Sequence, residues 1–237
     1  LTISAVGLGC VTFGREIDED TAYRIMDYAV ENGITFFDTA EVYGGGQARR
    51  YRKEAFGTED EREASGEISS SERIVGRWMR SRGCRDDVTL CTKVISGGDA
   101  DSISRALDGS LERLGTDNVD IYKMHEPDPD TPIAETMAAM TAEANAGRIG
   151  VVGGSNYSAA QLREALDASA DGGYRRFEIV QPPYSLALPD AEEELFPMCA
   201  REEIAVTPFS LLGAGFLTGK YTPDRSAIPL TTRFGVM

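Results

Sequence analysis

Short apolar runs alternate along the chain with longer stretches in which apolar residues recur every three or four positions. The short runs predict buried strands and the longer stretches predict amphipathic helices. The predicted strands are residues 5–8, 35–38, 88–93, 119–125, 149–153, 178–181 and 205–209. The predicted helices are residues 18–31, 71–82, 102–114, 130–146, 159–168 and 190–202. This alternation indicates a parallel sheet whose strands are connected by helices.

Capping residues support two of the helix starts. Asp18 precedes the first helix as an N-cap, and Asp130-Thr131-Pro132 has the polar cap and proline of another helix start. Gly33 and Gly147 follow the last turns of these two helices and predict where they stop.

Seven strands are one short of a closed eight-stranded barrel. We therefore expect a single domain over residues 1–237, built on the plan of an α/β barrel whose last unit is missing from the sequence. A sheet with free edges at its first and last strands is prone to aggregate, which suggests that the sequence is part of a longer protein.

One connection is unusually long. Residues 45–70 are polar, and the basic run Arg49-Arg50-Tyr51-Arg52-Lys53 precedes the acidic Glu59-Asp60-Glu61. We favour a solvated loop. The alternative is that its basic half overhangs the active-site mouth and attracts an anionic substrate, in which case KM for the substrate depends on ionic strength.

Composition limits the class of protein. The apolar fraction of 41% supports a sizeable core, and a formal charge of −15 argues against a general role at nucleic acids or at membrane surfaces. The four cysteines are Cys10, Cys84, Cys91 and Cys199, and no C-x-x-C occurs, so we expect reduced thiols in a cytoplasmic protein without a metal site. The uncharged stretch 204–219 is too short and too rich in glycine to span a membrane.

Reactive side chains stand at or just beyond the ends of three successive strands. Asp38 ends the second strand with Tyr43 five residues later, Lys93 ends the third, and the only histidine, His125, ends the fourth. In a barrel of parallel strands these ends meet on one face, where active sites are built. Each residue alone has an ordinary structural explanation, whereas their joint placement favours an enzyme.

These four side chains suit carbonyl reduction, which needs a hydride on one side and a proton on the other. Tyrosine is a weak acid, with a reference pKa of about 10. An ammonium such as Lys93 stabilises the phenolate of Tyr43 and lowers that pKa. Asp38 can keep Lys93 charged, and His125 can donate to the carbonyl oxygen or pass a proton to Tyr43.

Several separate segments resemble, in order, the motifs of the aldo-keto reductase family. These segments are residues 37–44, 92–93, 124–132, 153–156 and 208–210, within a resemblance that covers about residues 5–233. The resemblance implies a (β/α)8 TIM barrel and a catalytic tetrad of Asp38, Tyr43, Lys93 and His125. It also implies NADPH-dependent reduction of an aldehyde or ketone, a small-molecule carbonyl substrate, with Tyr43 as the general acid.

The same resemblance implies a cofactor site for NADP(H). Ser155, Asn156 and Gln181 match residues that bind the carboxamide, and Phe209 matches the ring that stacks on the nicotinamide. The remaining matches are Ser210, Leu211, Leu212, Gly213 and Gly215 for the pyrophosphate, Lys220 and Arg233 as cationic contacts, Cys10 and Val11 after the first strand, and Asp38. Leu211 replaces a proline of the family pattern, and the segment that holds the 2′-phosphate is absent, so the preference for NADPH over NADH follows from the family alone.

Two other functions compete with this one. Val11-Thr12-Phe13-Gly14 resembles the potassium-channel β-subunit branch, which suggests a regulatory subunit that binds NADP(H) without catalysis. Those subunits carry asparagine at the position of His125, so the complete tetrad favours catalysis. An aldolase-type barrel with Lys93 as a Schiff base ranks last, because Asp38 would keep that lysine protonated.

Overall fold

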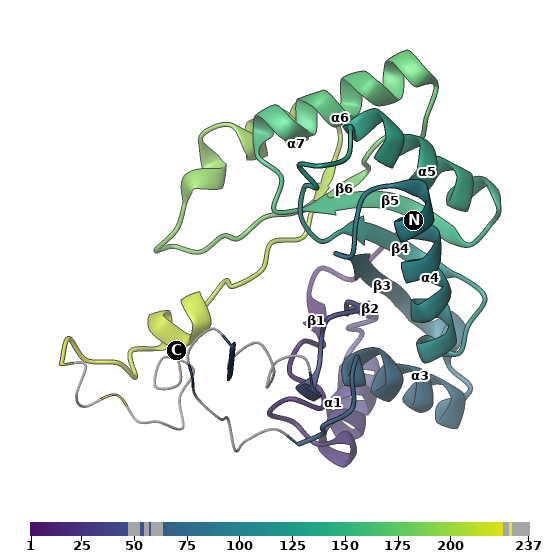
Figure 1. Ribbon diagram of the computed structural model, residues 1–237. Coiled ribbons are helices and arrows are strands. Elements are labelled where there is room, and N and C mark those ends of the chain that lie inside the picture. Colours follow the sequence, from purple (N-terminus) through teal and green to yellow (C-terminus); the bar gives the residue numbers. More distant parts are fainter. Residues whose placement is uncertain (47–52, 55–56, 58–63, 225–227, 229–237) are drawn as a thin grey trace.

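The computed structural model describes residues 1–46, 53–54, 57, 64–224 and 228. In these residues seven parallel strands form one sheet in chain order, from β1 to β7. The strands are β1 (Gly7–Gly9), β2 (Phe36–Asp38), β3 (Thr89–Val94), β4 (Val119–Met124), β5 (Ile149–Ser155), β6 (Ile179–Gln181) and β7 (Ala205–Val206). Figure 1 shows the sheet curled, with helices along its outer side. The fold is a (β/α) barrel with seven strands, open between β1 and β7 over the described residues, which confirms the predicted fold class.

Six α-helices and three short 3₁₀ helices are described. They are α1 (Glu19–Glu31), α3 (Ser70–Arg82), α4 (Ala100–Leu114), α5 (Ile133–Asn145), α6 (Ala159–Gly172), α7 (Leu195–Arg201), η1 (Arg85–Asp87), η2 (Asp190–Glu192) and η3 (Gly213–Thr218). Asp18 caps α1 by accepting a 2.7 Å hydrogen bond from the Thr21 amide, as predicted. Most other boundaries lie within two or three residues of the predicted ones.

Three predicted boundaries were wrong, and proline contributes to each. The helix expected at Asp130 begins only at Ile133 with Pro132 as its N-cap, because the residue before a proline is driven to an extended conformation. The helix expected over 190–202 is divided into η2 and α7, since the Pro197 ring would clash with the carbonyl of Glu193 in a continuous helix. The strand expected over 205–209 ends at Val206, and Pro208 lacks the amide hydrogen that a ladder needs.

Side chains alternate between two apolar layers along the strands. Phe37, Leu90, Tyr122 and Val180 face the helices in the main core. Their neighbours Phe36, Cys91, Ile121 and Ile179 form a smaller cluster inside the barrel. Because successive strand residues point to opposite faces, the residues two positions beyond this inner cluster also point inward. These residues are Asp38, Lys93, Lys123 and Gln181, which lie at the carboxyl ends of their strands.

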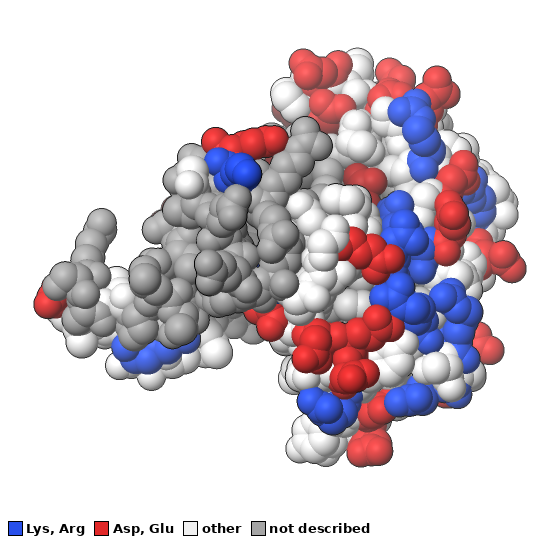
Figure 2. All heavy atoms as spheres, turned by 60° about the horizontal axis from the view of Figure 1, so that its bottom comes forward, with Lys and Arg blue, Asp and Glu red and all other residues white. Residues whose placement is uncertain are grey.

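The described surface carries charges of both signs (Figure 2). Figure 2 shows acidic and basic side chains interspersed on one face of the molecule. No helix in the described part is both long and apolar enough to cross a membrane. The four cysteines are free and buried, and no cluster of metal-ligating side chains occurs among the described residues.

Candidate active site

The Lys93 ammonium is the centre of the cluster at the carboxyl ends of the strands. Its Nζ donates to Asp38 Oδ1 in a buried ion pair and to the carbonyl oxygen of Thr39 at 2.8 Å. The same nitrogen lies 3.4 Å from the Tyr43 hydroxyl and 4.7 Å from the centre of the Tyr43 ring. Lys93 is 1% exposed, so its charge acts in surroundings where electrostatic interactions are strong.

The connection after β2 fixes Tyr43 above this ammonium. The Tyr43 amide donates to the carbonyl of Ala40 at 3.0 Å, and its own carbonyl accepts from the Ser71 amide at 3.2 Å. Ser71 belongs to the first turn of α3, so β2 and α3 hold the tyrosine from both sides. Its position therefore depends on the backbone rather than on one flexible side chain.

His125 completes the cluster from the end of β4. Its amide donates to the Val94 carbonyl at 2.8 Å, and its carbonyl accepts from Asn156 Nδ2 at 2.9 Å. The imidazole meets the Tyr43 ring edge to face, with centroids 5.4 Å apart. Its buried Nδ1 has no hydrogen-bond partner among the described residues.

The ion pair shifts the titration of two of these groups in the expected direction. Burial raises the pKa of Asp38, but the Lys93 and Lys123 ammonium groups outweigh burial and hold this pKa at about 2. Burial lowers the pKa of Lys93, but Asp38 outweighs burial and the pKa lies above its ordinary value. Both groups are therefore charged at neutral pH.

Tyr43 and His125 are both neutral at physiological pH. Burial raises the pKa of Tyr43, and the opposing effect of Lys93 does not overcome it. The prediction that Lys93 brings this pKa below its ordinary value was therefore wrong for the protein alone, although the ammonium acts in the predicted direction. Burial, followed by the charge of Lys93, lowers the pKa of His125 to about 4.

Sequence reasoning missed a second buried lysine. Lys123 is fully buried inside the barrel, and its Nζ lies 3.3 Å from Asp38 Oδ2 and 3.2 Å from Thr207 Oγ1. In the sheet register it stands opposite Lys93. The alternation of strand side chains could have predicted its inward position, because Lys123 lies two residues before His125 and two after the inward Ile121.

The residues expected to bind the carboxamide lie together at the ends of β5 and β6. Ser155 Oγ donates to the Gln181 carbonyl at 2.8 Å, and Gln181 Nε2 donates to Asp38 Oδ2 at 3.2 Å. Asn156 has a left-handed backbone conformation, with φ of 62°, that directs its Nδ2 to the His125 carbonyl. The amide oxygens of Asn156 and Gln181 are suitable acceptors for a carboxamide beside the tetrad.

The loop after β7 contains several residues in a left-handed backbone conformation. Ser210, Gly213, Ala214 and Gly215 all have positive φ, and the amides of Gly213 and Gly215 donate to the carbonyls of Ser210 and Leu212. A Cβ on Gly215 would come within 2.7 Å of the Lys220 ammonium, so this glycine and this cation lie side by side. Pyrophosphate binding by this loop stays a prediction.

Other expected contacts have less support. Phe209 is 38% exposed and pairs through its backbone with Pro183 and Tyr184. The Cys10 amide donates to the Asp38 carbonyl, and its own carbonyl accepts from Ser71 Oγ, so both of its backbone groups are already used. Leu211 and Leu212 are exposed, Val11 lies in the turn after β1, and these contacts stay predictions. Arg233 and the basic residues 49–52 lie outside the described residues.

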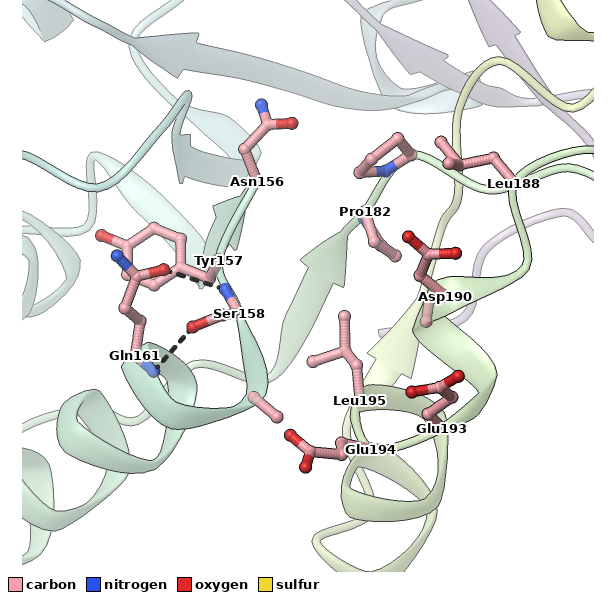
Figure 3. A pocket seen from close by; sticks show the side chains of 13 residues that line it. Asn156, Tyr157, Ser158, Gln161, Pro182, Leu188, Asp190, Glu193, Glu194 and Leu195 are labelled. Carbon is pink, nitrogen blue, oxygen red and sulfur yellow. Dashed lines mark hydrogen bonds between the residues drawn. The ribbon is translucent and has the colours of Figure 1, made fainter.

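Two hollows lie beside the tetrad rather than over it. One, of about 410 Å³, separates Tyr157 and Ser158 from Leu188 and Leu195 (Figure 3). The other, of about 520 Å³, follows the β4–α5 connection and shares Asn156 with the first. Carboxylates line both, namely Asp190, Glu193 and Glu194 in the first and Glu126, Asp128 and Glu164 in the second. Neither hollow therefore suits a phosphate group.

Residues 5–234 match the Aldo/keto reductase family. The chain belongs to this family. The match covers the seven strands, the four tetrad positions and the loop after β7, and it confirms the resemblance stated from the sequence motifs.

Individual relatives include an oxidoreductase and a probable channel subunit. The chain is 34% identical over 237 residues to the uncharacterized oxidoreductase YrpG of Bacillus subtilis (strain 168), covering 93% of this chain and 66% of the relative. It is 33% identical over 252 residues to a probable voltage-gated potassium channel subunit beta of Arabidopsis thaliana, covering 100% of this chain and 68% of that protein. The chain thus spans about two thirds of the length of these relatives.

A solved structure has a similar fold over the part that superposes. The crystal structure of an aldo/keto reductase from Klebsiella pneumoniae in complex with NADP and acetate superposes with a TM-score of 0.73 at 29% sequence identity. The superposition covers 90% of this chain and 66% of the other.

Proposed function

We propose that this protein is an NADPH-dependent aldo-keto reductase that converts an aldehyde or ketone into an alcohol. One observation carries the proposal: the Tyr43 hydroxyl lies 3.4 Å from a lysine ammonium whose charge is maintained by a buried carboxylate. A phenol, an ammonium and a carboxylate in this order form a proton donor whose conjugate base is stabilised. Family membership supports the same chemistry.

Each side chain has a separate task in this reaction. Tyr43 donates its proton to the carbonyl oxygen, and Lys93 stabilises the phenolate that remains. Asp38 keeps Lys93 charged and in place. His125 is neutral, so one of its ring nitrogens can donate a hydrogen bond to the same oxygen while the ring packs against Tyr43.

The cofactor of the proposed reaction is NADP(H), supported by the complex of the Klebsiella relative with NADP. When bound, it supplies the hydride. Asn156 and Gln181 would hold the carboxamide, and Phe209 would lie against the ring. The left-handed loop from Ser210 to Gly215, with Lys220, would hold the pyrophosphate.

The test compares wild-type protein with Tyr43→Phe. NADPH binding is followed by fluorescence, and turnover is measured with a panel of aldehydes and ketones. Both proteins should bind NADPH, and only the wild type should turn over. Equal turnover in the two proteins would exclude Tyr43 as the proton donor, and binding without turnover in either would exclude catalysis.

The second candidate is a regulatory subunit that binds NADP(H) without catalysis. The identity of 33% to the channel subunit of Arabidopsis over the whole chain supports it. His125 favours the enzyme, and the absence of wild-type turnover in the test above would favour the subunit. The Schiff-base alternative loses support because Lys93 is 1% exposed and carries a raised pKa, so its amine is protonated and inaccessible.

A further inference from the structure

Lys123 places a second ammonium group at the floor of the site. Its side chain is fully buried, and Nζ contacts Asp38 Oδ2 at 3.3 Å and Thr207 Oγ1 at 3.2 Å. The Thr207 hydroxyl lies 3.4 Å from the Val180 carbonyl, to which it donates, so it is oriented to accept from the ammonium. Gly153 stands opposite Lys123 in the register, and a Cβ there would come 3.2 Å from Lys123 Cγ. The Lys123 ammonium is therefore held by one contact from β2 and one from the residue after β7.

The charges around Asp38 do not balance. Asp38 Oδ1 accepts a hydrogen bond from Lys93, and Oδ2 accepts from Lys123 and from the neutral amide of Gln181. Two ammonium groups share one carboxylate, so one positive charge is uncompensated in a buried place. Burying such a charge is costly, and an apolar side chain of similar volume is often neutral or stabilising in its place. A purely structural role thus gives little reason for a lysine here.

We propose that Lys123 is a positioning residue of the active site, which clamps the Asp38 carboxylate together with Lys93 and leaves one net positive charge beneath Tyr43 and His125. The proposal rests on the proposed function for its catalytic meaning. Lys123 has no contact with the reacting atoms and acts through Asp38.

The groups that face this pair of lysines are few. In the described structure the titratable ones are Cys10 after β1, Asp38 from β2, Cys91 and Lys93 from β3, Tyr43 from the β2–α3 connection and His125 after β4. The strands β5 and β6 contribute the uncharged Gly153 and Gln181, and the uncharged Thr207 follows β7. Asp38 is therefore the one negative charge against two positive ones.

The effect of this charge should reach His125. Burial is the main cause of the low pKa of His125, followed by Lys93, and Lys123 acts in the same direction. Lys123 also helps to hold down the pKa of Asp38. Removal of the Lys123 charge should therefore let the imidazole take up a proton at higher pH.

The test uses the fact that His125 is the only histidine of the chain. The protein is labelled at histidine and titrated by NMR without cofactor or substrate, as wild type and as Lys123→Met. The midpoint of the titration should move upward by about one pH unit in the variant. Lys123→Gln, which keeps a polar group, is titrated as well and should show the same direction of shift, in case the methionine variant does not fold.

The matched control is Arg85→Met. Arg85 pairs with Asp120 at 2.9 Å, at the opposite end of β4 from His125. The substitution therefore removes one cation from an ion pair that is distant along the strand. The midpoint of the His125 titration in Arg85→Met should equal that of the wild type. If the midpoint of His125 stays at the wild-type value in the folded lysine variants, the inference is overturned.

Turnover separates this inference from the proposed function. The His125 titration is measured without catalysis, so its outcome tests the role of Lys123 whether or not the protein is an enzyme. A wild type that reduces no carbonyl compound would contradict the proposed function and leave the titration result unaffected. In an active wild type, Lys123→Met should lower kcat, because Asp38 loses one of the donors that hold it in place against Lys93. An unchanged kcat together with a shifted His125 would overturn the positioning role.

Discussion

The rings of Tyr43 and His125 meet edge to face, with their centroids 5.4 Å apart and their planes at 81°. Tyr43 follows β2 and His125 follows β4, so the contact crosses over β3, whose last residues include Lys93. The contact buries the imidazole next to a cluster in which Lys93 and Lys123 share the Asp38 carboxylate. This burial has consequences for stability as well as for chemistry.

The single histidine should make the protein less stable in mild acid. The pKa of His125 is lowered from 6.5 to about 4 in the folded state, so between these values the unfolded chain binds a proton that the folded chain does not. Stability is therefore lost as pH falls from about 6.5 to about 4, by up to about 3 kcal/mol. Urea denaturation at pH 7 and pH 4.5 measures the loss.

The control for this prediction is His125→Gln, which cannot bind the proton. Between the two pH values, the free energy of unfolding of this variant should fall by about 2 kcal/mol less than that of the wild type. Protonation of carboxylates contributes equally to the loss in both proteins. Equal losses would mean that His125 titrates normally in the folded protein.

Replacement of Lys93 should abolish the proton-transfer chemistry without loss of cofactor binding. Lys93→Met removes the ammonium 3.4 Å from the Tyr43 hydroxyl, while Asp38 keeps its ion pair with Lys123. We expect kcat to fall by about 100-fold or more. The comparison is Lys220→Met on the cofactor loop, which should weaken NADPH binding and change kcat little. A Lys93→Met variant with near-normal kcat would contradict the assigned role.

A buried ion pair outside the barrel should matter for stability. Glu72 of α3 is fully buried and accepts from Arg113 Nε at 2.6 Å and from Thr92 Oγ1 at 2.5 Å. Arg113→Met leaves this carboxylate without its cation and should lower the free energy of unfolding by about 3 kcal/mol. Arg163→Met breaks the exposed pair with Glu202 and should change the free energy of unfolding much less, because solvent screens that pair. Similar losses in the two variants would show that burial of the Glu72 pair has no special effect.

The cofactor loop should be sensitive to a methyl group at one glycine in particular. Gly215 has φ of 92°, and a Cβ there would displace the Lys220 ammonium, 2.7 Å away. Gly219 also has positive φ, at 75°, but a Cβ there meets nothing within 4 Å. Gly215→Ala should therefore raise the Kd for NADPH several-fold more than Gly219→Ala, measured by fluorescence titration. If the two variants bind equally well, the placement of Lys220 does not contribute to cofactor binding.

Much of the site was predictable because it depends on chain order. Asp38, Lys93 and His125 end or follow successive strands, and neighbouring parallel strands bring such positions together whatever the details of packing. The Asp18 cap was predictable for a similar reason, since its hydrogen bond reaches only three residues along the chain.

Other features depend on contacts between distant residues. The Lys123 side chain is found beside Asp38 only because register pairs Lys93 with Lys123 and Lys123 with Gly153, and register is set by the whole sheet. The pKa of Tyr43 is raised because the effect of burial outweighs the effect of the Lys93 ammonium. Depth of burial cannot be predicted from a local sequence motif. The division of the 190–202 helix had a local cause in Pro197, which the apolar periodicity concealed.

The sequence by itself determined the order of strands and helices, the family and the identity of the four residues that gather at the strand ends. These properties follow from apolar periodicity, local capping and motifs that are short in the chain. Tertiary structure decided which charges share the Asp38 carboxylate, how deeply each group is buried and which of them is protonated. Those properties depend on distances between side chains from different strands and on the exclusion of water, and both arise only when the sheet curls into a barrel.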